Sequence, residues 1–527
     1  MKKYAIILIS ALLLQALLLV SATAQEQVPR KVILDNGLTV ILLENHNAPV
    51  VTLQAWVHAG TLTEREFIGS GISHFVEHML FKGTERRSVG EIGQAVKEAG
   101  GTTNAYTGHD KTVYFVTCHS DYLGQALDVL SDAIMNSVFD PAEVEREREV
   151  IVKEIKMNRD DPFRRLYTRA QLTAYAVHPY GVPVIGYEEL LRKLTREDLL
   201  TYYRRMYVPN NMTFIAVGDF NADEALSQVK SAFGDFERSS IAPLSIPQEP
   251  PQEGPREFVE EFDVTVAQHM MGFHGPSLFS DDMYPMDVLA LILGGGNTSR
   301  LYQELREKQG LVYNIGAWSS TPPDPGMFWV SSSFEPENFD AVQQAIWRQI
   351  ERMKTEKVSE KELETARAKV LSDYLFAKES VEGQARSLGT GQVSAHDLYF
   401  DKRYVESVSR VTAEDIQRVA RAYFTEGNVV TAALTPRGKA PVPAAREDEH
   451  PQASPEIEKV VLPNGITLLL RNDPNTETVA IRSVFLGGLL AEDESNVGIT
   501  NLMRKSMLKG TRTRSAEQIA SASESRG

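Results

Sequence analysis

Two histidines four residues apart, with a glutamate directly before the second, stand in the stretch SHFVEH as His74, Glu77 and His78. On a helix, residues four apart lie on one face, so both imidazoles can point at one ion with Glu77 beside them. The alternative is a pair of histidines packed by chance into an apolar helix. Catalytic zinc takes three protein ligands and keeps one open position, so a third ligand must come from elsewhere in the chain.

The stretch DPAEVEREREVIVKEIKMNRDDP begins with Asp140-Pro141, a typical helix start, and continues in helical period. Glu147 and Glu154 fall on the apolar stripe of that helix. An acid on such a face must be paired or metal-bound to offset its desolvation, so a metal site and two buried salt bridges both remain open. The charged residues off the stripe are predicted to be solvated: Glu143, Glu145, Arg146, Arg148 and Glu149.

Two stretches rich in Pro, Ser and charge, residues 239–255 and 435–456, are predicted to be linkers. Residues 28–238 open with RKVILDNGLTVILLEN, two β-rich runs around an Asn-Gly turn, and continue with helical stretches. Residues 256–434 repeat that order: strand-like AQHMMGFHGP, helical MDVLALILGG, strand-like GMFWVSSSF and a long helical run. Each of the two segments is therefore predicted to be an α+β domain.

The remaining segment, residues 457–527, repeats the beginning of the chain. EKVVLPNGITLLLRNDPNTETVAIRSVFLGG at 458–488 matches residues 30–60 without a gap, and after one deleted residue 501–515 matches 74–88. His74, Glu77 and His78 are replaced by Asn501, Arg504 and Lys505, so no zinc is expected there. We expect this segment to be the truncated start of a second repeat, too short to build its own core.

Composition narrows the class of protein. The 527 residues are 42% hydrophobic and 24% charged, which is ordinary for a globular chain of several domains, and the net charge of −16 argues against nucleic-acid binding.

Residues 1–24 have a charged start, an apolar core and an Ala-x-Ala end, as in a cleaved signal peptide; an uncleaved anchor is the alternative. No later apolar run is long enough to span a membrane. The prediction is export to the periplasm or the medium, and the single Cys118 excludes an intrachain disulfide.

The H-x-x-E-H order, with Glu154 some 75 residues beyond the second histidine, resembles the insulinase/pitrilysin family of zinc peptidases, which includes the mitochondrial processing peptidases. The resemblance covers nearly the whole mature chain. It implies tandem domains, each a mixed or antiparallel sheet with helices on one face, paired around an enclosed chamber. By that likeness His74, His78 and Glu154 bind zinc, Glu77 is the general base and Glu147 supports the site.

Two further stretches carry the same resemblance. GGTTNAYTGHDKTVYFV at 100–116 is similar to the substrate-binding edge strand of the family, with Asn104 and Ala105 meeting the peptide backbone. LGGGNTSRLYQELREKQGLVYNIGA at 293–317 is similar to the segment whose arginine and tyrosine close over the site, here Arg306 and Tyr313. Four other histidines are predicted to be ordinary polar residues: His58, His109, His119 and His178.

The resemblance implies an exported zinc endopeptidase that acts on peptides or unfolded polypeptide segments. Glu77 would take a proton from the attacking water, and the Tyr313 hydroxyl would help to stabilise the oxyanion. The alternative is a peptide-binding or assembly partner that keeps the fold without turnover. The expected partners are peptide substrates and, for an assembly, further copies or related chains.

Overall fold

The computed structural model describes residues 28–439 and, further along the chain, 458–470, 483–484, 496, 498–507, 509–515 and 518. The chain divides into two units, residues 1–444 and 445–527. The predicted signal peptide and most of the second predicted linker lie outside the described residues. Among the described helices, none has the length and apolar character to cross a membrane.

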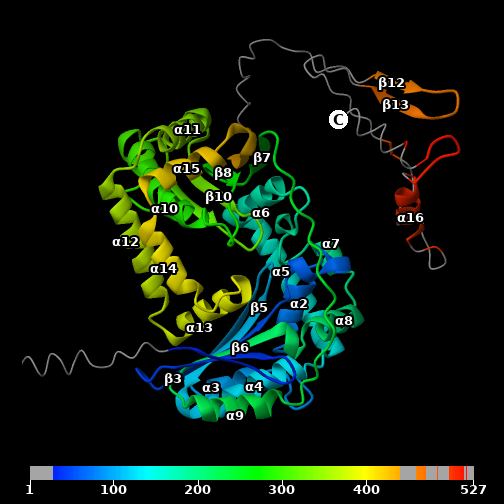
Figure 1. Ribbon diagram of the computed structural model, residues 1–527, viewed down its shortest axis with the longest axis vertical. Coiled ribbons are helices and arrows are strands. Elements are labelled where there is room, and N and C mark those ends of the chain that lie inside the picture. Colours follow the sequence, from blue (N-terminus) through cyan, green and yellow to red (C-terminus); the bar gives the residue numbers. More distant parts are fainter. Residues whose placement is uncertain are drawn as a thin grey trace, which may run out of the picture. The chain divides into compact units, whose positions relative to one another are not determined.

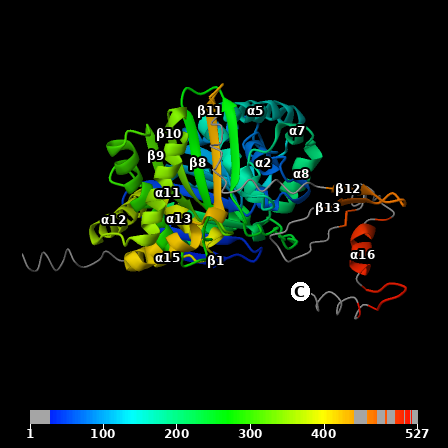
Figure 2. The same ribbon diagram turned by 90° about the horizontal axis from the view of Figure 1, so that it is seen from above.

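Figures 1 and 2 show the first domain in two views, with its helices packed beside a sheet. The sheet has six strands in the order β1-β2-β6-β3-β5-β4, with β2 and β6 parallel and the other neighbours antiparallel. As predicted, the Asn36-Gly37 turn joins β1 and β2. Helices α2 to α5, α8 and α9 bury their apolar residues against one face of this sheet. The elements are β1 Arg30–Ile33, β2 Thr39–Glu44, β3 Val50–Val57, α2 Ile72–Met79, α3 Glu91–Glu98, β4 Thr102–Thr107, β5 Thr112–His119, α4 Leu123–Met135, α5 Pro141–Asp160, α6 Pro162–Ala174, α7 Glu188–Leu191, α8 Arg196–Met206, β6 Met212–Gly218 and α9 Ala222–Phe233.

The second domain has the same plan with one strand fewer. Its sheet runs β7-β11-β8-β10-β9, and β7 and β11 form the single parallel pair. Its own helices again cover one face, so the predicted α+β class with mixed sheets is confirmed. The elements are β7 Arg256–Phe262, β8 Ala267–His274, α10 Met283–Gly294, β9 Asn314–Ser320, β10 Met327–Phe334, α11 Phe339–Thr355, α12 Glu360–Ala377, α13 Val381–Gly389, α14 Phe400–Arg410, α15 Ala413–Tyr423 and β11 Val429–Pro436.

The second face of each sheet is covered by a helix from the other domain. Helix α6 of the first domain buries Leu166, Ala170 and Ala174 against β7, β8, β10 and β11 of the second. Helix α13 of the second domain buries Ala385 against Trp56 and Ile215 of the first sheet. The two domains therefore share their hydrophobic cores, because burial of these faces requires both.

A single methyl group placed between α13 and the first sheet is expected to destabilise the packing of this helix on the sheet. A Cβ on Gly389 would lie 2.2 Å from the indole carbons of the fully buried Trp56, so Gly389→Ala should destabilise the protein by about 1–3 kcal/mol. The melting temperature measured by calorimetry checks this. Gly93→Ala in α3 is the matched control: its Cβ meets nothing within 4 Å, so it should leave stability unchanged or raise it. Equal melting temperatures for both variants would show that the contact carries no stability.

The C-terminal unit repeats the local structure of the chain's beginning. Strands β12 (Glu458–Val461) and β13 (Thr467–Leu470) pair in the register of β1 and β2, so that Glu458 faces Leu470 as Arg30 faces Leu42. Helix α16 (Ile499–Ser506) follows a left-handed glycine, Gly498, as α2 follows Gly71. The described residues thus reproduce a hairpin and a helix of the first domain.

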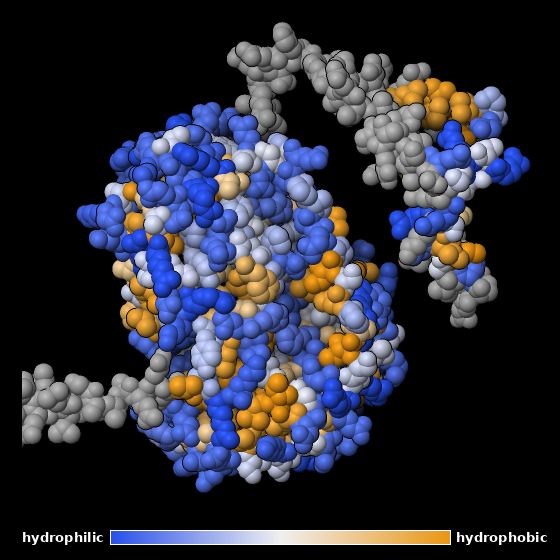
Figure 3. Space-filling model, viewed as in Figure 1, coloured by the Kyte–Doolittle hydropathy of each residue, from blue (hydrophilic) through white to orange (hydrophobic). Residues whose placement is uncertain are grey.

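The apolar residues of this repeated hairpin and helix are not buried. Phe75 and Val76 of α2 are inaccessible to solvent, whereas Leu502 and Met503 at the same positions of α16 are 66% and 55% exposed. Leu469 of β13 is 68% exposed, and Figure 3 shows hydrophobic side chains gathered on the β12–β13 hairpin. Within the described residues, the C-terminal unit leaves uncovered the faces that form the core of the first domain.

Candidate metal and peptidase site

Helix α2 is fixed at its start by a glycine turn and two polar contacts. Gly71, at φ 70°, turns the chain into the helix. The Ser73 amide donates to Glu64 Oε1 at 3.2 Å, and Ser73 Oγ lies 2.7 Å from the Tyr202 hydroxyl. Burial raises the pKa of Glu64 to about 7. Because one helical stripe packs into the core, the opposite stripe presents His74, Glu77 and His78 to a pocket.

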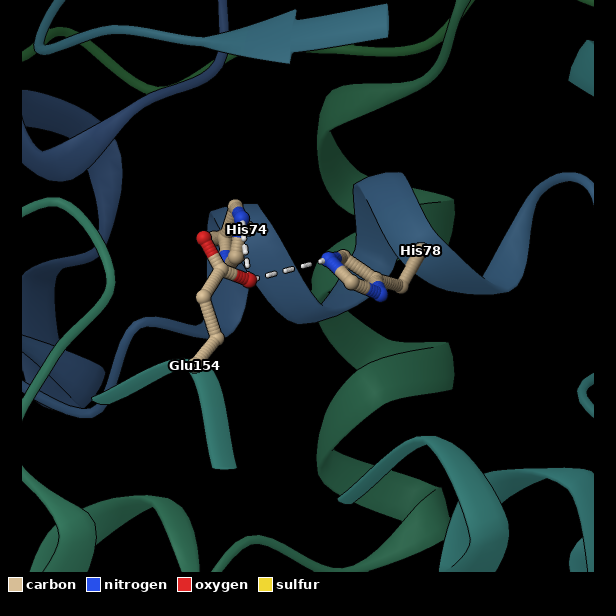
Figure 4. A group of neighbouring side chains, drawn as sticks. All are labelled: His74, His78 and Glu154. Carbon is tan, nitrogen blue, oxygen red and sulfur yellow. Dashed lines mark ion pairs between the residues drawn. The ribbon is translucent and has the colours of Figure 1, made fainter. Parts of the chain in front are cut away.

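His74, His78 and Glu154 form the one group of three or more potential metal ligands found among the described residues. Glu154 Oε2 of α5 lies 3.9 Å from His74 Nε2 and 3.8 Å from His78 Nε2, and one atom of each residue lies within 4.8 Å of the others (Figure 4). These separations are too long for hydrogen bonds, but they suit an ion with ligand bonds of ~2.0–2.2 Å. The donor set of two imidazoles and one carboxylate fits zinc.

Glu147 supports His78 from behind. Its Oε2 lies 3.1 Å from His78 Nδ1, its Oε1 lies 2.8 Å from Lys82 Nζ, and its side chain is 5% exposed. A carboxylate at Nδ1 fixes the imidazole so that Nε2 faces the ligand site. The two options left open by the sequence are thus both present: Glu147 is a buried ion-paired carboxylate, and Glu154 lies with the two histidines.

Replacing Glu147 by Gln is expected to weaken zinc binding about 10–100-fold, because the charge that orients His78 and pairs with Lys82 is lost. Competition against a fluorescent chelator measures this affinity. Glu145→Gln, on the exposed side of the same helix, is the control and should bind zinc as the parent does. If Glu147→Gln binds zinc with the affinity of the parent, Glu147 does not position His78 for the metal.

The stripe prediction was wrong for two residues of α5. Glu143 and Arg148 were expected to be solvated, but both are buried. Arg148 donates to the Leu191 carbonyl at 2.8 Å and lies 5.4 Å over the Phe75 ring. Arg148 is buried because the C-terminal end of α7 covers this side of α5, a long-range contact that helical period alone does not contain.

Glu77 faces the same pocket and is held by a residue that the sequence did not single out. Thr107 Oγ1, at the end of β4, donates to Glu77 Oε2 at 2.5 Å. Burial raises the pKa of Glu77, with the Thr107 hydrogen bond acting in the opposite direction. Thr107 shares a strand face with Ala105, so strand period after the predicted edge-strand residues was the signal that could have found it.

His74 is held in its neutral form. Burial, with a smaller contribution from His78, lowers the pKa of His74 to about 3. A metal ligand must be unprotonated, so this environment keeps the imidazole ready to coordinate near neutral pH. Its Nδ1 is buried without a hydrogen-bond partner among the described residues, unlike Nδ1 of His78.

The pocket around these residues has a volume of ≈ 600 Å³ and is lined entirely by the first domain. Besides α2, β4 and α5, its wall contains one side of α6 and the segment 180–185. His109, expected to be an ordinary histidine, also lines it, and its Nδ1 lies 2.7 Å from Thr61 Oγ1. The sequence interpretation missed the α6 wall, which consists of Phe163, Arg164, Tyr167, Thr168 and Gln171.

Strand β4 is the edge strand of the first sheet, as predicted, and Ala105 lines the pocket. Asn104 Oδ1 accepts a hydrogen bond of 2.9 Å from the Ala105 amide. An added peptide strand that pairs with this amide must therefore displace the Asn104 carboxamide. The edge of β4 is available for pairing with a peptide strand, and the Asn104 side chain occupies one of its backbone donors, the Ala105 amide.

The structure does not bring Arg306 and Tyr313 to the pocket. Arg306 is exposed on the helical turn Tyr302–Lys308, where its guanidinium lies 5.1 Å over the Tyr302 ring. Tyr313 is 53% exposed, and its hydroxyl donates to Glu335 at 2.5 Å. Their predicted closure over the site remains a prediction that requires a different arrangement of the two domains.

Two α+β domains that exchange helices around an H-x-x-E-H helix with a distant glutamate define the class of an inverzincin-type metallopeptidase. The model of the family described as "Insulinase (Peptidase family M16)" matches residues 39–187 and again 467–527. A second family model, described as "Peptidase M16 inactive domain", matches residues 193–370. An uncharacterized zinc protease of Rickettsia felis is 31% identical over 405 residues, which cover 76% of this chain and 96% of that protein. The chain belongs to the insulinase family, peptidase family M16.

Other relatives and solved structures agree with this assignment. An uncharacterized zinc protease of Bacillus subtilis is 28% identical over 77% of this chain and 98% of its own. A probable mitochondrial-processing peptidase subunit beta of Arabidopsis thaliana is 26% identical, covering 76% of this chain and 77% of its own. A crystal structure of a Helicobacter pylori protease superposes with a TM-score of 0.74 at 26% identity, covering 78% of this chain and all of that one.

Proposed function

We propose that the protein is an exported zinc-dependent endopeptidase that hydrolyses peptides or unfolded polypeptide segments. The observation that carries this proposal is the convergence of His74, His78 and Glu154 in one pocket with the buried carboxylate of Glu77. The naming of several relatives as zinc proteases supports it.

The chain's own residues have separable roles in this proposal. Bound zinc supplies a Lewis acid and lowers the pKa of water from ~15.7 toward ~7. Glu77 accepts the proton of the attacking water and returns it to the leaving amine. Thr107 holds one oxygen of Glu77, and Glu147 holds His78. No nucleophilic side chain is required.

The substrate is proposed to bind as an added strand on β4. The free edge next to the pocket would hold an extended backbone through Asn104 and Ala105, so a folded protein would be a poor substrate. A quenched fluorescent peptide, assayed with and without chelator and after zinc is restored, tests the activity. Turnover that is unaffected by complete metal removal would contradict the proposal.

A non-catalytic peptide-binding or assembly partner is the second candidate. It is favoured by one observation, the match of residues 193–370 to a domain described as inactive. The two functions differ in the same assay, because a partner protein would bind the peptide without cleaving it.

The proposal of an exported endopeptidase also includes peptide partners, oligomerisation with like or related chains, and location in the periplasm or medium. Cell fractionation with N-terminal sequencing tests export and cleavage after Ala24.

Removing the C-terminal repeat is expected to leave the zinc site intact. Helix α16 carries Asn501 and Arg504 at the positions of His74 and Glu77, and Arg504 Nη2 lies 3.4 Å from Asn501 Oδ1 on the exposed helix surface. A protein of residues 25–456 should therefore bind one zinc and turn over peptide at nearly the full-chain rate. Elemental analysis and the peptide assay check this. A folded, zinc-free product would show that the repeat helps to build the metal site.

A further inference from the structure

The second domain contains a cavity at the place that corresponds to the metal pocket of the first. The five strands of the second sheet match β2-β6-β3-β5-β4 of the first in order, so that β9 is the edge strand in place of β4, and α10 and α12 stand in place of α2 and α5. Between them lies a cavity of ≈ 350 Å³, which helix α14 also lines. The two pockets are thus built from equivalent elements.

Asp287 and Asp373 of this cavity stand where the first domain has metal ligands. When the stretch Leu293-Gly294-Gly295-Gly296 is aligned with Leu80-Phe81-Lys82-Gly83, Asp287 takes the position of His74. Counted from the first residues of α12 and α5, Asp373 takes the position of Glu154. Alanine and leucine replace the glutamate and second histidine, as Ala290 and Leu291.

Two carboxylates without a third ligand do not make a zinc site, since zinc in proteins requires at least three such donors. No group of three potential ligands occurs here among the described residues. The cavity is therefore acidic but lacks the third ligand that a zinc ion requires.

The walls of the cavity are aromatic as well as acidic. Trp318, Tyr374 and Tyr404 line it, and the rings of Tyr374 and Tyr404 lie 6.5 Å apart at an interplanar angle of 27°. Aromatic faces attract cations through their quadrupole, and more strongly where the cation is removed from water. Carboxylates and aromatic rings around one cavity are the composition that recognises a guanidinium or an ammonium group.

Neither Asp287 nor Asp373 forms an ion pair within the described part of the chain, and Asp287 Oδ2 accepts a hydrogen bond of 2.7 Å from the Tyr404 hydroxyl. Lys378 lies 4.6 Å over the Tyr374 ring, but its charge is paired with Asp401. Burial raises the pKa of Asp287 to about 6, the cost expected of a carboxylate that lacks a cationic partner.

We propose that this cavity binds a positively charged group, the guanidinium or ammonium of an arginine or lysine side chain on a polypeptide. It would be a second contact point, away from the metal pocket, for a chain that carries basic residues. Only the source of the cation rests on the proposed peptidase function. The affinity for a cation stands on the residues of the cavity alone.

The test uses the full chain and two isosteric probes, Nα-acetyl-arginine amide and its neutral counterpart Nα-acetyl-citrulline amide. Binding is followed by the indole N–H resonance of Trp318, assigned with Trp318→Phe. The arginine compound should shift this resonance saturably, and the citrulline compound should not. Asp373→Asn and Asp287→Asn should each weaken binding about tenfold, the loss expected for one charge-assisted contact. Asp281→Asn, exposed and outside the cavity, should bind as the parent does.

Equal binding of the two probes, or parent-like binding by both variants, would overturn the proposal. Asp373 is exposed, so Asp373→Asn is expected to fold even if the partly buried Asp287 does not tolerate substitution. A second arm compares an unstructured peptide with one arginine and its citrulline analogue, using Glu77→Gln protein to prevent cleavage. Preference for the arginine peptide supports a polypeptide source, and its absence assigns the site to small amines. Cleavage is not measured, so failure here is distinct from failure of the proposed function.

Discussion

Glu77→Gln should retain its metal and lose peptide hydrolysis by about 10²–10⁴-fold. Gln cannot accept a proton from water, but it has the shape of Glu and can still accept the Thr107 hydrogen bond. The site around it should therefore remain assembled. Zinc content by elemental analysis and initial rates with a quenched fluorescent peptide give the two quantities needed.

The control for this experiment is Glu85→Gln, an exposed glutamate beyond the end of the same helix that does not line the pocket. It should match the parent in both zinc content and rate. If Glu77→Gln cleaves peptide at the parent rate, the general-base role is wrong and another group must take the proton. If it loses zinc as well, Glu77 contributes to the metal site itself.

Glu154→Gln should lose zinc, with an affinity reduced by more than the ~100-fold limit seen for residues that only support a ligand. Without this carboxylate, two neutral imidazoles remain as donors, and the positive ion loses its charged ligand. Activity should fall in parallel with the bound metal and recover in part at excess zinc. Glu149→Gln, exposed on the same helix, provides the comparison.

The order of effects in α5 separates a ligand from a supporting residue. Glu154→Gln should lower zinc affinity more than Glu147→Gln, because Glu154 faces both histidines whereas Glu147 contacts only the Nδ1 side of His78. The reverse order, measured in the same chelator competition, would exchange the two assignments.

Local signals in the sequence predicted the domain class and the helix faces that carry the candidate ligands, whereas the choice of His74, His78 and Glu154 as a ligand set came from the resemblance to the family. Helical period placed His74 and His78 on one face and put Glu154 on the inner side of α5, and the structure brings the three together. The Asn-Gly turn and strand patterns predicted the two sheets. These features depend on neighbours within one or two turns, which the sequence records directly.

Features that depend on contacts between distant elements were not predicted. Arg148 is buried because the C-terminal end of α7 covers it, and Thr107 at the end of β4 donates a hydrogen bond to Glu77 in α2. The exchange of α6 and α13 between domains gave no signal, because an amphipathic helix does not reveal which sheet it covers. The acidic cavity at Asp287 is formed by α10, β9, α12 and α14, which lie far apart in the sequence, so no local pattern indicates it.

The most direct test of the central claim is the number of zinc ions per chain, measured together with peptide turnover as metal is removed and returned. One zinc per chain should be found, turnover should disappear with it on chelation, and one equivalent of zinc should restore both. A His74→Ala, His78→Ala double variant should hold no zinc at this site. Zinc that persists in that variant, or full turnover by the metal-free protein, would contradict a catalytic zinc held by His74, His78 and Glu154.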